Sequence, residues 1–193
     1  GLWQNQARNL LSESARLVSV AIQNEHLSII QNKQQTVERE LNLARDIQKT
    51  FLPEELPETP GYDIQVSWQT ARQVGGDFYD FFTIRPGLLG VVIADVSDKG
   101  LAASLYMAVS RTLIRAMALE TPQPAATLEK VNRLLQLDSK QGFFVTTFYG
   151  QLELATGQFI YSNAGHNPPL LYDAANQRIS ALNRGGIALG MIE

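Results

Sequence analysis

The sequence predicts an α+β protein in which a long helix precedes a layered β-sandwich of two antiparallel sheets flanked by helices. Residues 1–52 contain no proline and are rich in Leu, Ala, Gln, Glu and Arg, which is a helical composition. Beyond Pro53, short apolar segments stand before and after two helical segments, without the strand–helix alternation of a parallel sheet. We therefore expect a helical linker over residues 1–52 and a layered domain over residues 53–193.

The linker carries a heptad pattern typical of a coiled coil. Apolar residues alternate at spacings of three and four, as a seam between two helices requires. The seam positions are Leu27, Ile30, Gln34, Val37, Leu41, Ala44, Gln48 and Phe51. The pattern favours a parallel homodimer through residues 27–52, and the alternative is that the stripe packs on the chain's own domain. Residues 10–27 have a broader apolar face and resemble the closing helix of a GAF-type sensor domain.

The domain's elements follow from periodicity and from turn residues. Strands are predicted at 62–70, 78–84, 88–94, 143–154, 158–163, 170–173 and 178–182, and helices at 99–120 and from Pro124. On the first helix, the predicted buried stripe is Leu101, Leu105, Ala108/Val109, Leu113 and Ala116/Met117. Ser97 or Asp98 is expected to cap this helix.

Composition excludes several functional classes. The net charge of −3 gives no basic surface for nucleic acid. The absence of cysteine excludes thiolate chemistry, disulfides and zinc–sulfur sites. Because no apolar stretch approaches a membrane span and the N-terminus lacks a signal-peptide pattern, we expect a cytoplasmic protein without direct membrane insertion. The sequence begins within a predicted helix and stops abruptly at residues 190–193, so we expect a fragment.

Two acidic motifs, at residues 75–80 and 94–100, predict a site for hard cations. Asp77 follows two glycines and Asp95 follows a buried-strand pattern, so neighbouring strands would bring both carboxylates to one end of a sheet. Two anions placed together need a cation, and oxygen-only ligands favour Mg²⁺ or Mn²⁺. Acidic strand ends are common, however, and the residues alone leave this site open. Asp80 is as well explained by a turn hydrogen bond, and Asp98 better by helix capping than by metal ligation.

A second unusual segment, residues 163–169, holds a histidine between asparagines, a glycine and prolines. Such a composition predicts a rigid loop. His166 has the chemistry of a general acid or of a phosphate-orienting group, but the residues alone favour a role in fixing the loop. The glycine pairs at 75–76 and 185–186 match neither a P-loop nor a dinucleotide fingerprint.

Five segments together resemble the SpoIIE/RsbU-like group of PPM-type, PP2C-like, metal-dependent bacterial serine/threonine phosphatases. The segments are residues 43–48, 74–81, 94–100, 144–148 and 163–170, and they occur in the family's order. The resemblance implies hydrolysis of phosphoserine or phosphothreonine on a protein, with two Mn²⁺ or Mg²⁺ ions and a STAS-type anti-sigma-factor antagonist as the usual substrate. It also implies that the helices from Lys99 and Pro124 form a switch moved by an upstream sensor through the helical linker.

The resemblance assigns roles to individual residues. Asp95 resembles the carboxylate that bridges both metals, Asp77 binds the cluster directly or through water, and the Val96 backbone carbonyl completes the second metal's shell. Asp98 is close enough to Asp95 in sequence to tune the metal affinity of the site. Gly76 and His166 are candidates for a phosphate-binding or loop role.

One departure from the family pattern concerns the remaining ligands. Members of the family carry a Thr-Asp-Gly-type motif after a glycine-rich segment and a final Asp, whereas no Asp follows Asp173 here. We therefore expect the C-terminal part of the fold, and with it part of the metal site, to be missing from this sequence. The alternative is a catalytically inactive, phosphatase-like binding or dimerisation module.

Overall fold

The protein was analysed as a computed structural model that describes residues 2–70, 72–138, 142–183 and 185–192. The chain divides into two compact units between Leu43 and Ala44. Helix α1 (Leu2–Phe51) contributes to both units, and its last turns, from Ala44, belong to the globular unit. The compact units therefore divide several residues before the domain boundary that we predict between residues 52 and 53, and that boundary stays a prediction.

Helix α1 ends where Pro53 removes a backbone donor and clashes with the preceding turn. Upstream of the division, Leu27, Ile30 and Val37 are 56%, 40% and 54% exposed. Gln48, by contrast, is only 3% exposed within the globular unit. The heptad stripe is thus split: its upstream part is free to pair, while Gln48 packs on its own domain, as the alternative interpretation expected. No helix in the described part of the chain combines the length and apolar character needed to cross a membrane.

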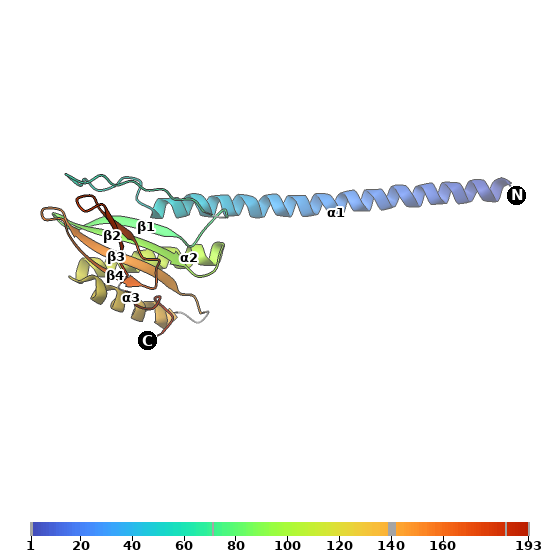
Figure 1. Ribbon diagram of the computed structural model, residues 1–193. Coiled ribbons are helices and arrows are strands. Elements are labelled where there is room, and N and C mark those ends of the chain that lie inside the picture. The colour runs from blue at the N-terminus through green and yellow to red at the C-terminus, as the bar shows by residue number, and fades with distance from the viewer. Residues whose placement is uncertain (1, 71, 139–141, 184, 193) are drawn as a thin grey trace. The chain divides into compact units, whose positions relative to one another are not determined.

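Four antiparallel strands form the main sheet, in the order β1-β2-β3-β4 (Figure 1). They are β1 (Phe78–Arg85), β2 (Leu88–Val96), β3 (Val145–Glu153) and β4 (Gln158–Ala164). Gly87 and Gly157 close the two hairpins at φ +83° and +72°, a conformation that favours glycine. The predicted strands are confirmed within one or two residues at most ends, and the α+β class with antiparallel sheets is confirmed.

Helices α2 (Leu101–Glu120) and α3 (Pro124–Asp138) cover one face of this sheet (Figure 1). The sequence places Leu128, Val131, Leu134 and Leu135 on one face of α3, and this is confirmed in the main: three of them are at most 3% exposed, and Leu134 is half-buried. For α2 the predicted apolar stripe was wrong over the first turns, because Leu101, Leu105 and Val109 are 49–62% exposed. Its later members Leu113 and Met117 are partly buried and pack against the core. The residues that face the core are Ala103, Ser104, Met107, Ser110, Ile114 and Ala118. Small alanines and serines let α2 lie close to the sheet, and a count of large apolar residues therefore selects the wrong face.

The second sheet is a two-stranded hairpin of β5 (Leu170–Asp173) and β6 (Arg178–Ala181), and all eight residues are exposed. The predicted strand over residues 62–70 was wrong as a hydrogen-bonded element, because this segment has no ladder partner among the described residues. Its alternation is partly retained, with Tyr62, Ile64 and Trp68 half-buried. Side-chain periodicity reports burial on one face, and a strand needs a backbone partner as well.

Candidate active site

The register of β1 and β2 brings the two predicted acids together. Phe78 pairs with Ala94 at the end of the ladder, so the next position places Asp77 opposite Asp95. Residues opposite each other on antiparallel strands have Cβ atoms about 4.5–5.5 Å apart. The strand pairing therefore turns two motifs that are separate in sequence into one carboxylate pair at the sheet's end.

The electrostatics of this pair favour a cation. Burial raises the pKa of Asp95 to about 6, and a hydrogen bond and the charge of Asp77 add to the rise. The rise reflects the cost of holding two like charges close together in a partly desolvated place. A divalent cation between the two oxygen donors would remove that repulsion, so the residues present fit a hard metal ion.

Glycine at position 76 is required by the packing behind the acids. A Cβ on Gly76 would lie 2.9 Å from the Val96 carbonyl oxygen and 3.0 Å from the Val96 Cβ. Residues 75–76, called the glycine turn below, therefore pack closely against the Val96 carbonyl, which is the backbone group predicted as a metal ligand. Both residues line a cavity of about 360 Å³ together with the two acids.

Asp98 also lines this cavity, but its carboxylate is engaged locally. Its Oδ1 accepts a hydrogen bond of 2.7 Å from the Lys99 amide, and its φ is +76°. Among the residues described, no three His, Cys, Asp or Glu side chains form a metal-binding group. A metal role for Asp98 therefore stays a prediction.

The capping expectation for α2 was wrong. Gly100 occupies the N-cap without a side-chain hydrogen bond. The Ser97 hydroxyl instead accepts a hydrogen bond of 3.0 Å from the Phe144 amide, and Asp98 lies in the tight turn before the helix. Both polar side chains are used to shape the loop under the cavity.

His166 reaches the acids through β3. Asp95 pairs with Thr146, and the Thr146 hydroxyl lies 2.9 Å from His166 Nδ1. Burial lowers the pKa of His166, while the charge of Asp77 opposes that shift. The Asn163 side chain also brackets the loop, accepting from the His166 amide and donating to its carbonyl. Asn163 and Thr146 thus fix His166 in its loop, as the loop interpretation expects. His166 lines a neighbouring cavity together with Asp77, and a role toward phosphate stays a prediction.

Sequence reasoning missed two groups in the cavity, Arg72 and Lys99. Both side chains carry a positive charge, which is complementary to a phosphate group. No spacing rule singles out Arg72, because it lies in irregular backbone before the glycines. Thr146 was predictable in principle, since the register of β2 and β3 sets it opposite Asp95.

Asp80, for which a turn hydrogen bond was considered, is a buried structural anion on β1. Its side chain is 1% exposed, and its carboxylate lies 3.2 Å from Arg111 Nη2 and 3.6 Å from Arg115 Nε. Burial raises the pKa of Asp80, and the two guanidinium groups oppose the rise. The turn interpretation was wrong because Asp80 lies mid-strand and faces α2.

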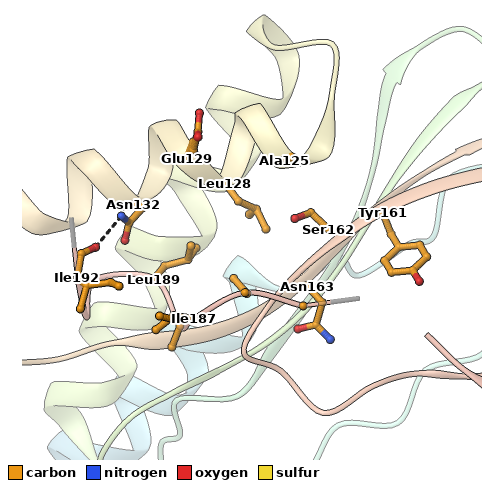
Figure 2. Close-up of a pocket in the computed structure, with 14 residues that line it drawn as sticks. Ala125, Leu128, Glu129, Asn132, Tyr161, Ser162, Asn163, Ile187, Leu189 and Ile192 are labelled. Carbon is orange, nitrogen blue, oxygen red and sulfur yellow. Dashed lines mark hydrogen bonds between the residues drawn. The ribbon is translucent and has the colours of Figure 1, made fainter. Parts of the chain in front are cut away.

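Figure 2 shows a separate cavity of about 460 Å³ between α3, β4 and residues 185–192. Asn132 donates to the Ile192 carbonyl at 3.0 Å and accepts from the Gly190 amide at 2.7 Å. The cavity shares no lining residue with the acidic one. Its Asn132 contacts fasten the C-terminal segment to α3.

Comparison with known proteins decides the family. The profile of the family described as Stage II sporulation protein E (SpoIIE) matches residues 85–193, more than half of the chain. The chain belongs to the SpoIIE family. The SpoIIE-family fold seen here is that of PP2C phosphatase domains: the SiaA-PP2C domain of Pseudomonas aeruginosa superposes with a TM-score of 0.70 at 20% identity, covering 83% of this chain and 65% of that domain.

Two relatives place this SpoIIE-family chain by sequence. Protein IcfG of Synechocystis is 30% identical, covering 79% of this chain and 28% of its own length. Phosphoserine phosphatase RsbU of Bacillus subtilis is 28% identical, covering 82% of this chain and 47% of its own length. The chain thus spans less than half the length of either relative.

Proposed function

We propose that this protein hydrolyses phosphoserine or phosphothreonine on a regulatory protein, with Mn²⁺ or Mg²⁺ as cofactor. The observation that carries the proposal is the carboxylate pair Asp77–Asp95, which lines a cavity together with Arg72. Burial, with the hydrogen bond and charge of Asp77 adding to it, raises the pKa of Asp95 to about 6. The similarity to a phosphoserine phosphatase supports this reaction class. A STAS-type anti-sigma-factor antagonist is the proposed substrate.

The proposed roles combine the family resemblance with the positions of these residues around one cavity. Asp77, Asp95 and the Val96 carbonyl would hold the ions, with Asp98 tuning affinity from the same cavity. When bound, two such ions supply an activated water and neutralise the phosphoryl group. Arg72 and Lys99 would bind the phosphate oxygens.

His166 has a supporting role in this proposal. Its Nδ1 is held by the Thr146 hydroxyl at 2.9 Å, so the ring is oriented by a partner that itself pairs with Asp95. From this position the imidazole would hold a proton or orient a phosphate oxygen next to the acids.

The test is phosphate release from a phosphoserine peptide by the full-length protein with and without Mn²⁺. Asp95→Asn removes one charge at nearly constant shape, and we expect at least a hundredfold loss of kcat, with Asp63→Asn as the exposed control. Retained activity in Asp95→Asn would exclude this site as the metal centre.

The second candidate function is a phosphatase-like binding or dimerisation module without catalysis. It is favoured by one observation, that no group of three metal-ligating side chains occurs among the described residues. Calorimetric titration with Mn²⁺ separates the two functions. Tight, Asp95-dependent binding supports the enzyme, while absence of Mn²⁺ binding and of phosphate release by the full-length protein supports the module.

Regulation by an upstream sensor through α1, and homodimerisation through the part of residues 27–52 that lies upstream of the globular unit, are also part of the proposal. The exposed Leu27, Ile30 and Val37 supply an apolar stripe that a second copy would cover. Light scattering of the full-length protein and of Ile30→Lys tests this arrangement, which requires a lower mass in the variant.

A further inference from the structure

Gln48, on the last turns of α1, makes a two-point contact with the backbone of the glycine turn. Its Nε2 donates to the Gly75 carbonyl, and its Oε1 accepts from the Gly75 amide at 3.2 Å. The side chain is only 3% exposed. A primary amide that pairs with both backbone groups of one residue replaces the neighbouring strand which that residue lacks.

The glycine turn has little freedom on its other sides. A Cβ on Gly75 would meet the Thr70 side chain at 3.0 Å, and a Cβ on Gly76 would meet Val96 at 2.9–3.0 Å. The Asp77 carbonyl accepts a hydrogen bond of 3.0 Å from Trp68 Nε1. Only Gly76 stands between the contacted residue and the acid, so a change at Gly75 is carried directly to Asp77.

We infer that Gln48 is a positioning residue for the Asp77–Asp95 pair. Its amide fixes the backbone of Gly75, sets the place of Asp77 opposite Asp95, and couples the end of α1 to the acids. The expected effect of Gln48 on metal binding rests on the proposed function. Its contact with Gly75, and the effect of that contact on the backbone of residues 75–77, do not depend on it. Leu52, 7% exposed, anchors the same helix end by apolar packing and is independent of the glycine turn's hydrogen bonds.

The Gln48→Met substitution separates the contribution of the two hydrogen bonds from that of side-chain burial. Methionine has a similar length and volume and no donor or acceptor of comparable strength, so packing is retained and both bonds are lost. Gln48→Asn is the second variant, because it keeps the amide but is one methylene too short to reach. Gln35→Met, at an exposed position of the same helix, is the matched control.

The experiment uses the full-length protein and two readouts besides activity. We expect Gln48→Met and Gln48→Asn to weaken Mn²⁺ binding, measured by calorimetry, by about tenfold, the effect typical of residues that orient metal ligands. In metal-free protein, amide hydrogen exchange at residues 75–77 should accelerate in both variants and stay unchanged in Gln35→Met. A folded variant with unchanged exchange and unchanged Mn²⁺ affinity would overturn the inference.

The two proposals fail in different ways. If the unsubstituted protein binds no Mn²⁺ and releases no phosphate, the proposed function fails, and exchange at residues 75–77 still decides whether Gln48 fixes the turn. If Gln48→Met proves unstable, Gln48→Asn provides the same comparison with a polar side chain. Faster exchange there supports the inference, and unchanged exchange contradicts it.

Discussion

Asp77 and Asp80 belong to one short motif, yet their surroundings are opposite. Asp80 is 1% exposed and lies between Arg111 and Arg115, which balance its charge. Asp77 is exposed and lies beside Asp95, whose pKa it helps to raise. Asp80 thus has opposite charges beside it, whereas Asp77 and Asp95 have each other's like charge beside them. The proposed function uses the second arrangement for metal binding and leaves Asp80 a part of the fold.

The largest expected effect tests the structural side of this comparison. Asp80→Asn leaves the Arg111 guanidinium, whose side chain is 12% exposed, without its counter-charge. Breaking a buried pair by removing one partner costs about 3–5 kcal/mol of unfolding free energy. Urea unfolding of Asp80→Asn, with Asp63→Asn as the exposed control, measures this loss. Equal stabilities would show that Asp80 is not a structural anion.

The opposite sign is expected at Asp77. In metal-free protein with EDTA, Asp77→Asn removes one member of a repelling pair, so the melting temperature should stay equal or rise. The pKa of Asp95 should fall at the same time, because the Asp77 charge is one cause of its rise. Thermal unfolding and carboxyl NMR provide the measurements. A clear loss of metal-free stability would mean that Asp77, like Asp80, is structural.

The two arginines around Asp80 should differ in importance. Arg111 donates to Asp80 Oδ1 at 3.2 Å, while the Arg115 side chain is 39% exposed and stacks over Phe82 at 5.2 Å. We expect Arg111→Met to lower the unfolding free energy by roughly twice as much as Arg115→Met, since exposed charge pairs contribute little. The paired unfolding curves measure the ratio, and a larger loss in Arg115→Met would reverse the assignment.

Much of this arrangement was predictable from local pattern. The strands that carry Asp77 and Asp95 follow from apolar runs and turn residues, and the pairing of two consecutive antiparallel strands brings their ends together. Sequence also placed the loop of His166. These features depend on neighbours in the chain, which periodicity and turn chemistry record.

The remaining features depend on partners distant in sequence. Gln48 looked like a coiled-coil seam residue because its spacing fits a heptad, and only the fold shows that its amide pairs with Gly75. The predicted face of α2 was wrong over its first turns because close approach to the sheet places Ala103 and Ser110 there instead of the larger Leu105 and Val109. Asp80 has no local signal at all, since its partners lie on α2.

The smallest expected effect measures how far the charge of Asp77 extends. Burial lowers the pKa of His166 below its usual value of about 6.5, and the Asp77 charge partly opposes this. Asp77→Asn should therefore lower the His166 pKa further, as followed by imidazole NMR in metal-free protein, whereas Asp80 is not among the causes of the shift. An unchanged His166 pKa in Asp77→Asn would show that the acid and the imidazole are not coupled.

The linked effect on stability has a definite sign. A histidine whose folded pKa is depressed binds fewer protons when folded than when unfolded, so its contribution to stability is complete above about pH 6.5. That contribution is lost as the pH falls through the unfolded value. The loss should be steeper in Asp77→Asn than in the unsubstituted protein, because removing the nearby anion makes the imidazolium still less favourable in the folded state. The same substitution lowers the pKa of Asp95, which is about 6, and this change steepens the slope in the same direction. Unfolding free energies measured between pH 7.5 and pH 5 in EDTA test this slope, and a shallower slope in Asp77→Asn would contradict the coupling.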